Sequence, residues 1–294
     1  MGKIVGATLC SHVPRLMIPP EKRRDYMGGK ISTFYEALER MQAEQIHNRR
    51  FDTFLVFDTH WWTTLEFVLN AHGWHVGRYT SDEIPWMITD LPYDYPGDPE
   101  LADQIGEEAK GAGVPVYVAR EKNLPWHYPT LNTMKYLNPE RRPVLPISVA
   151  YTSSVEEELL FGEAIRRAIE KGSRNVLLVA TGGLSHRFWE LDKVRQRASA
   201  DPSDIYSEEN RRYDEKIICY LKEGRHREVI EAADDFRKMC SPEGRFAHYL
   251  RMVGALGGKG CHLGGIQYGE YEAAIGTGQV NLWFNNDIPS HTLS

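Results

Sequence analysis

The chain has 294 residues, of which 41% are hydrophobic and 26% charged, a composition typical of a globular protein with a sizeable core. Its 41 acidic and 35 basic side chains give a net charge of -6 and lie scattered along the chain, which argues against a nucleic-acid partner. The four cysteines form no CxxC pair, and no apolar run reaches the roughly 20 residues of a membrane span, which indicates a cytoplasmic protein without membrane partners.

Short β-branched runs alternate with helical patterns along the chain, which indicates a sheet covered by helices. In chain order the pattern predicts strand 3–9, helix 31–48, strand 53–57, strand 144–150, helix 156–170, strand 175–180, helix 208–221, a helical stretch after Glu243 and a closing strand 279–284. The Pro-rich stretch 85–99 is predicted to be a loop whose aromatic side chains pack on the rest of the protein. We therefore expect one α/β domain spanning residues 1–294.

Three histidines follow predicted strands directly. His12 follows the first strand, His60 the second and His186 the strand 175–180. Ligands of α/β proteins gather beyond the carboxyl ends of the strands, where loops present side chains on a rigid base. A single histidine at such a place is more often a packed or capping residue, but three at equivalent places favour a site.

This pattern alone is consistent with a metalloenzyme. Two histidines and one carboxylate on one face of an ion leave the other face open, an arrangement typical of non-haem Fe(II) oxygenases. Spacing does not choose the carboxylate, because six acidic residues lie near plausible loop or helix ends: Asp58, Asp90, Asp94, Glu121, Glu190 and Glu243. Nor does it choose between iron and zinc, since His2Glu sites also serve zinc hydrolases. A serine hydrolase is a weaker alternative, because Gly183-Leu184-Ser185-His186-Arg187 lacks the last glycine of a nucleophile elbow.

Motifs along most of the chain resemble the class III extradiol ring-cleaving dioxygenases. They occur in order as Ser11-His12-Val13-Pro14, Phe57-Asp58-Thr59-His60-Trp61, Tyr93-Asp94-Tyr95-Pro96-Gly97-Asp98-Pro99, Leu184-Ser185-His186-Arg187-Phe188, Glu243-Gly244 and Gly276-Thr277-Gly278-Gln279-Val280-Asn281. Within that class the chain is most similar to the enzymes that act on 3,4-dihydroxyphenylacetate. No single motif is diagnostic, but their succession is.

The resemblance implies a three-layer α/β/α fold around a mixed sheet and a homo-oligomer, either a dimer or a tetramer. It also implies that His12, His60 and Glu243 bind Fe(2+) and that His186 is the acid/base histidine. The reaction implied is extradiol cleavage of a catechol-type ring, such as that of 3,4-dihydroxyphenylacetate, or of a related aminophenol, with O2 to a hydroxymuconic semialdehyde-type product.

One motif departs from the family pattern. Many members have Asp-His-Gly where this chain reads His127-Tyr128-Pro129. The resemblance places Tyr128 beside the metal ligands, where its hydroxyl could donate a hydrogen bond. His127 either contacts an acidic substituent of the substrate or fills a loop. The departure leaves the substrate open.

Three further residues are candidates for substrate binding. Arg15 and Arg187 flank His12 and His186, and a guanidinium can bind a substrate carboxylate through two parallel hydrogen bonds. Trp62 could form one wall of a flat aromatic pocket. Two rival functions remain at this stage: a zinc hydrolase that uses the same histidines and glutamate, and a non-catalytic partner subunit of a dioxygenase.

Overall fold

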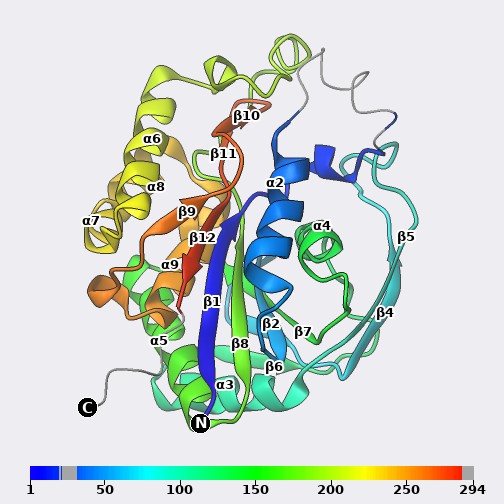
Figure 1. Cartoon of the computed structure of the whole chain (residues 1–294), viewed down its shortest axis with the longest axis vertical. Helices are drawn as coiled ribbons and strands as arrows, with labels where there is room; N and C mark the ends of the chain where they lie inside the picture. Colours follow the sequence, from blue (N-terminus) through cyan, green and yellow to red (C-terminus); the bar gives the residue numbers. More distant parts are fainter. Residues whose placement is uncertain (20, 22–31, 287–294) are drawn as a thin grey trace.

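The computed structural model describes residues 1–19, 21 and 32–286 (Figure 1). Its strands are β1 (Lys3–Cys10), β2 (Thr53–Thr63), β3 (Phe67–Asn70), β4 (Trp74–Tyr79), β5 (Leu91–Pro96), β6 (Val116–Ala119), β7 (Val144–Ala150), β8 (Asn175–Thr181), β9 (Gly265–Gln267), β10 (Glu272–Ala274), β11 (Thr277–Gln279) and β12 (Leu282–Asn285). Its α-helices are α2 (Phe34–Met41), α3 (Pro99–Gly111), α4 (Tyr128–Leu137), α5 (Val155–Lys171), α6 (Glu208–Lys222), α7 (His226–Glu231), α8 (Ala233–Cys240) and α9 (Ala247–Ala255). Shorter helical turns are η1 (Pro14–Met17), η3 (Gln42–Ile46), η4 (Pro202–Asp204), η5 (Glu243–Phe246) and η6 (Gly258–Gly260).

Eight of the strands form one mixed sheet in the order β6-β3-β7-β2-β8-β1-β12-β9. The four central strands β7, β2, β8 and β1 run parallel. At one edge β12 is antiparallel to both β1 and β9, and towards the other edge β3 is antiparallel to β7. Because the central strands are parallel, their carboxyl ends meet at one edge of the sheet, at the end opposite the N-terminus in Figure 1.

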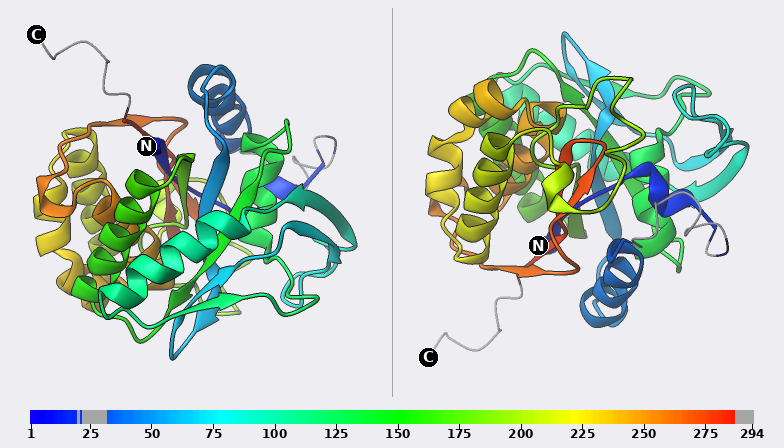
Figure 2. Two further views of the ribbon diagram at one scale, coloured as in Figure 1. Left: turned by 90° about the horizontal axis from the view of Figure 1, so that it is seen from below. Right: turned by 90° about the horizontal axis from the view of Figure 1, so that it is seen from above.

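Alternating residues of the central strands face two separate cores. Leu55 and Phe57 of β2 pack in one cluster, with residues of α3, α5 and α9. Phe54 and Val56 of the same strand pack in the other, with residues of α2 and α4. Successive side chains of a strand point to opposite faces, so this alternation places helices on both sides. Figure 2 shows α2 and the yellow and orange helices separated by strands. The predicted three-layer α/β/α fold with a mixed sheet is confirmed.

A buried ion pair joins α5 and α9, which pack on the same face of the sheet. The Arg251 guanidinium of α9 lies 2.8 Å from a carboxylate oxygen of Glu158 on α5, and both side chains are fully buried. Ser153 donates a 2.6 Å hydrogen bond to the other Glu158 oxygen, and Arg251 donates to the Ser148 carbonyl of β7. With each charge paired and further hydrogen-bonded, the two helices are fixed to each other and to the sheet.

Most predicted elements form with small shifts at their ends. The predicted helix 31–48 is α2 followed by the π-helical turn η3, and its first predicted residue, Ile31, lies outside the described residues. Strand β7 forms in spite of Pro146. Within the described residues, no helix combines the length and the apolar character needed to cross a bilayer.

Two predictions about local structure are wrong. The stretch 85–99 is not all loop, because it contains β5, which pairs with β4 in a separate two-stranded ribbon. The predicted packing of its aromatic side chains is confirmed for Tyr93 and Tyr95, which stack on Trp126, whereas Trp86 is 69% exposed. The predicted closing strand 279–284 is interrupted: β11 ends at Gln279 and pairs with β10, and β12 begins at Leu282 in the main sheet.

Candidate metal centre

Two histidines reach the carboxyl edge of the sheet from neighbouring parts of the chain. His12 lies two residues beyond β1. His60 was expected to follow its strand but lies within β2, at the place where the pairing of β2 with β7 is irregular between Asp58 and Trp62. Irregular pairing of this kind redirects side chains and is common next to active sites. It allows His60 to join His12, and the two imidazole rings meet edge to face with centroids 5.0 Å apart.

Glu243 reaches the same place from the turn that follows α8. Its backbone N–H donates to the Leu184 carbonyl, and its Oε2 accepts a 2.5 Å hydrogen bond from the Gly183 N–H. The next three residues, 244–246, all have the left-handed backbone conformation. Gly244 is required here, because a Cβ would lie 2.8 Å from the Thr59 side chain. Left-handed conformations at the other two positions cost energy and are typical of functional sites.

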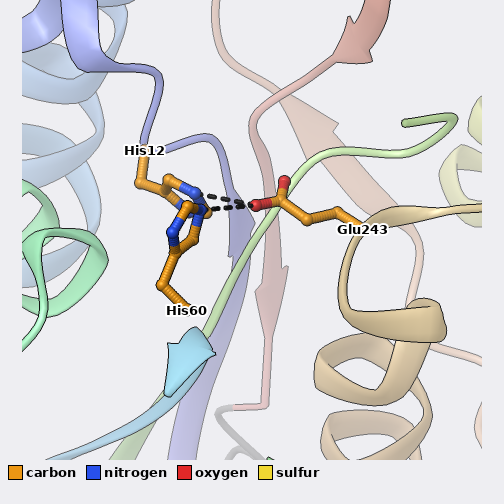
Figure 3. A group of neighbouring side chains, drawn as sticks. All are labelled: His12, His60 and Glu243. Atoms are coloured by element: carbon orange, nitrogen blue, oxygen red, sulfur yellow. Dashed lines mark ion pairs between the residues drawn. The ribbon is translucent and has the colours of Figure 1, made fainter. Parts of the chain in front are cut away.

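The three side chains converge on one carboxylate oxygen. Nε2 of His12 lies 2.8 Å from Oε1 of Glu243, and Nε2 of His60 lies 3.4 Å from it (Figure 3). One ligand atom from each residue lies within 4.8 Å of the others. Among the described residues, the ion-pair partners of this buried carboxylate are imidazoles alone. Two neutral nitrogens and one anionic oxygen are the donor set of a facial triad, so these residues fit a divalent cation.

Hydrogen bonds behind the histidines fix their orientation. The Nδ1 of His12 lies 2.8 Å from the hydroxyl of Thr181 at the end of β8. The backbone N–H of His60 donates to the buried Asp58 carboxylate, which also accepts from the hydroxyl and backbone N–H of Thr130. Partners of this kind hold metal ligands in place and aim their free nitrogens. Of these supporting residues, Asp58 was named from the sequence as one of six candidate carboxylates, and Thr130 and Thr181 were not singled out.

The electrostatics of the cluster favour a charged carboxylate at Glu243. Burial opposes ionisation of Glu243, but the neighbouring imidazoles of His12 and His186 outweigh it and hold the pKa of Glu243 well below its usual range. Burial lowers the pKa of His186. At His60 burial acts in the same direction, but the hydrogen bond to Glu243 and the negative charges of Glu243 and Asp58 together outweigh it and raise the pKa. A metal cation that binds at the imidazole nitrogens would displace any protons bound there and release them to solvent.

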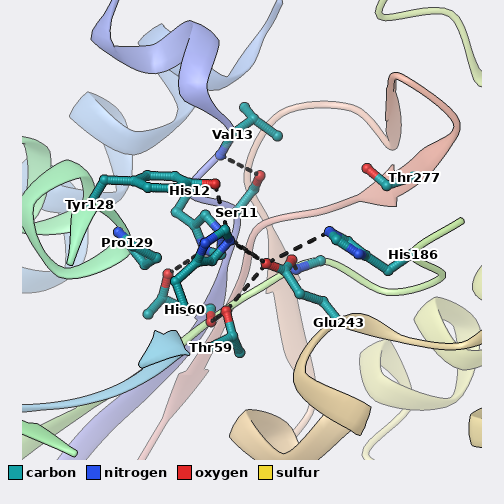
Figure 4. A network of polar contacts seen from close by, with 12 residues as sticks. Ser11, His12, Val13, Thr59, His60, Tyr128, Pro129, His186, Glu243 and Thr277 are labelled. Carbon is teal, nitrogen blue, oxygen red and sulfur yellow. Dashed lines mark hydrogen bonds and ion pairs between the residues drawn. The ribbon is translucent and has the colours of Figure 1, made fainter. Parts of the chain in front are cut away.

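His186 and Tyr128 complete the cluster (Figure 4). Nε2 of His186 lies 3.8 Å from Oε1 of Glu243, beyond hydrogen-bonding distance. The Tyr128 hydroxyl, at the start of α4, lies 3.0 Å from Nε2 of His60. Burial raises the pKa of Tyr128 well above its usual value, and the negative charge of Glu243 raises it further. The phenol therefore keeps its proton at neutral pH and can donate a hydrogen bond.

A cavity of about 390 Å³ opens beside these residues. It is lined by residues that include His60, Trp62, His186, Arg237, Glu243 and Arg245. Its volume lies within the range of small-molecule sites. Trp62, a sequence candidate, is 56% exposed and stacks on Tyr151 with ring centroids 4.7 Å apart.

Three other sequence candidates have partners elsewhere or lie outside this lining. Arg15 donates a 2.6 Å hydrogen bond to the Ala273 carbonyl and lies 3.6 Å from the Glu272 carboxylate. His127 stacks on Trp61. Arg15, His127 and Arg187 are not among the residues that line the cavity.

A buried acid behind His186 was missed by sequence reasoning. Asp214 of α6 accepts hydrogen bonds from the Ser185 hydroxyl at 2.6 Å, the Ser185 N–H at 2.9 Å and the Tyr271 hydroxyl at 2.6 Å. Burial raises its pKa to about 7. The signal was an acidic residue on the apolar face of a helix, in register with Ile217, Ile218 and Leu221. Asp214 thus anchors the residue that directly precedes His186.

Comparison with known protein families shows which family the chain belongs to. Residues 6–284 match the model of the catalytic LigB subunit of aromatic ring-opening dioxygenases. The chain belongs to this LigB family. It is an extradiol ring-cleaving dioxygenase, and the family is metal-dependent, which agrees with a possible His/His/Glu site.

Individual relatives support the LigB assignment. The chain is 31% identical over 261 residues to 3,4-dihydroxyphenylacetate 2,3-dioxygenase of Escherichia coli, covering 87% of this chain and 91% of the relative. It is 26% identical over 300 residues to the 2-aminophenol 1,6-dioxygenase beta subunit of a Pseudomonas species, covering 97% and 94%. A crystal structure of an uncharacterized protein from Escherichia coli K12 shares the fold, with a TM-score of 0.64 and 16% identity over 96% of this chain and 100% of that chain.

Proposed function

We propose that the chain is an Fe(2+)-dependent dioxygenase that opens a 3,4-dihydroxyphenylacetate-like or related substituted catechol to a hydroxymuconic semialdehyde-type product. The proposal rests above all on the convergence of His12, His60 and Glu243 beside an open cavity. The name of the Escherichia coli relative supports the choice of ring. We also propose that residues 1–294 form one catalytic domain and that identical chains assemble into a dimer or tetramer.

In this proposal Nε2 of His12, Nε2 of His60 and a carboxylate oxygen of Glu243 hold the iron. When bound, the ferrous ion would keep a catechol and O2 in contact and let electron density pass between them. Thr181 holds the His12 imidazole in the required orientation through its hydroxyl, and Asp58 fixes the backbone at His60 by accepting a hydrogen bond from its N–H. The buried position of His12 and Glu243 excludes water from one side of the site.

His186 is assigned the proton transfers. Because burial lowers its pKa, its imidazole is neutral at neutral pH and Nε2 can take a proton from a catechol hydroxyl. The same nitrogen can return the proton later in the reaction. Tyr128 keeps its proton and is assigned a hydrogen bond to the oxygen-bearing side of the substrate.

The proposed function is tested by oxygen uptake. Protein purified without oxygen and loaded with Fe(2+) should consume O2 and form a yellow product from 3,4-dihydroxyphenylacetate. Protocatechuate, catechol and 2-aminophenol are assayed beside it to define the ring that is preferred. Turnover of a substrate by the zinc-loaded protein without oxygen would support the hydrolase instead. Absence of turnover with every catechol would support a non-catalytic partner subunit.

We predict that Asp214 is a positioning residue for His186. Replacing it with alanine leaves the Ser185 N–H without a buried acceptor, which costs about 1–3 kcal/mol and frees the turn that carries His186. Asp214→Ala should therefore lower kcat roughly 10-fold or more at unchanged KM and metal content, because misplacing a catalytic group by about 1 Å can slow a reaction up to about 100-fold.

The conservative variant separates positioning from general damage. In Asp214→Asn the amide oxygen can still accept from the Ser185 N–H, and the amide NH2 can donate to the hydroxyls of Ser185 and Tyr271. We expect it to recover most of kcat. Equal losses in both variants, or a loss that follows metal content, would argue against the positioning role.

A further inference from the structure

Two arginines share the cavity with the proposed metal ligands. Arg237 lies near the end of α8, and Arg245 lies two residues after Glu243 in the left-handed turn. Both line the cavity together with His60, His186 and Glu243. Sequence reasoning had offered Arg15 and Arg187 instead, because they adjoin the site histidines in sequence.

Neither guanidinium is fully satisfied by the protein. Arg237 donates through Nε to the Arg245 carbonyl at 2.7 Å, but its Nη2 is buried without a hydrogen-bond partner. Nε of Arg245 is also buried without one. Within the part of the chain that the structure describes, neither guanidinium forms an ion pair with a carboxylate, whereas the buried Arg251 does. Burying a positive charge that has unpaired N–H donors costs free energy unless an anion pairs with it.

The two cations also lie close enough to affect each other. Burial lowers the pKa of Arg237, and the positive charge of Arg245 lowers it further. This repulsion would be relieved by an anion between them. The chain as a whole carries a net charge of -6, so this pair is a local positive region in a protein of net negative charge.

An aromatic side chain holds the Arg245 guanidinium at the cavity. The guanidinium carbon lies 5.6 Å from the centroid of the Tyr151 ring, which stacks in turn on Trp62. Stacking on a ring occupies the face of a guanidinium and leaves its edges, which carry the N–H donors, free to bind. Trp62, Tyr151 and Arg245 therefore form a continuous wall with an apolar part and a cationic end.

We propose that Arg245, supported by Arg237, binds a carboxylate on the side chain of the aromatic substrate, so that the enzyme selects catechols with an anionic side chain. The planar guanidinium matches a carboxylate through two parallel hydrogen bonds. The aromatic part of the wall would lie along the ring while the diol faces the histidines and Glu243. This inference rests on the proposed ring opening and adds the chemical group that the pocket selects.

The test compares two substrates that differ in one charge: 3,4-dihydroxyphenylacetate and its uncharged amide. The native enzyme should show a kcat/KM for the acid at least about 10-fold above that for the amide. Arg245→Gln should lower kcat/KM for the acid about 30-fold, mainly through KM, and change that for the amide less than about 3-fold. Arg245→Lys should lie between, because a lysine keeps the charge but not the paired donors.

A matched control removes a positive charge far from this chemistry. Arg40 is exposed on α2 and pairs with Glu44, so Arg40→Gln should keep the native preference for the acid. Metal content and the unfolding midpoint of each variant show whether it is folded. Equal losses for acid and amide in folded Arg245→Gln would overturn the assignment, as would a native enzyme without preference.

Binding calorimetry without oxygen keeps the inference separate from the proposed function. If the native protein binds the acid more tightly than the amide and Arg245→Gln does not, the arginine assignment holds even if no ring is opened. If acid and amide bind equally to the native protein, the assignment fails whatever the turnover. Turnover failure alone would concern only the proposed function.

Discussion

Replacing Glu243 with glutamine is expected to abolish ring opening and to lower metal affinity by at least about 100-fold. Glu243 contributes the only anionic oxygen of the His/His/Glu group, and both imidazoles point at that atom. Glutamine has a neutral amide, so the substitution removes the negative charge. The amide can also turn its NH2 group toward His12, and an NH2 group offers no lone pair to a metal ion at that position. Metal content after dialysis against a chelator, measured by mass spectrometry, and oxygen uptake with a catechol are the two measurements.

A second buried carboxylate provides the control for Glu243. Glu272 is 2% exposed and accepts hydrogen bonds from Ser32 and Thr33, but it does not line the cavity. Glu272→Gln should cost stability and leave the metal stoichiometry unchanged. Full metal occupancy in Glu243→Gln after the same dialysis would show that the cation is held elsewhere.

Replacing His186 with phenylalanine is expected to leave the metal bound and to slow turnover by about 100- to 10,000-fold, the range of a lost acid/base group. Phenylalanine is planar like imidazole and can keep the edge-to-face contact with Phe188, but it carries no proton to exchange. A single-turnover experiment, in which the anaerobic enzyme–substrate complex is mixed with O2, separates the slowed proton transfer from binding.

Two different results would contradict the acid/base role of His186. Ring opening at the native rate would remove its proton-transfer role. Loss of metal would make it a ligand instead, which is not expected because the group of ligand atoms that lie within 4.8 Å of one another contains His12, His60 and Glu243 but not His186. His47→Phe, at an exposed histidine on the outer surface, is the control and should behave like the native enzyme.

The layered fold could be predicted because its signals are local. Strands β2 and β8 carry unbroken runs of apolar residues that fill both cores, as in Phe54, Leu55, Val56 and Phe57. The positions of His12 and His186 follow from the same reasoning, since strand ends converge in a parallel sheet. These steps need no knowledge of distant contacts.

Glu243 could not be selected from the sequence by physical reasoning alone. It lies 183 residues beyond His60 in the chain, and its approach depends on the left-handed turn 244–246 and on a hydrogen bond from Gly183. Neither feature has a local pattern that marks it, because two of the three turn residues are not glycine. Only the family resemblance supplied this residue.

The two wrong predictions about local structure, at β5 and between β11 and β12, have a similar origin. Strand β5 contains Pro92 and Pro96, which read as loop residues, yet a strand of a two-stranded ribbon tolerates proline because one side of its backbone has no partner. The break between β11 and β12 falls at Asn281, whose side chain accepts a hydrogen bond from the Ser11 N–H and so contacts a neighbouring segment instead of continuing one strand. Both features depend on contacts between segments distant in the sequence.

The residues of the site differ in how far they are open to solvent. The side chains of His12 and Glu243 are 4% and 5% exposed, whereas those of His60 and His186 are 30% and 24% exposed. In the proposed function the ion and the aromatic ring would both enter from the side of the half-buried His60 and His186, which line the cavity. A ring bound on that side would cover the ion, so we expect the ion to bind before the substrate and to exchange more slowly while the substrate is bound.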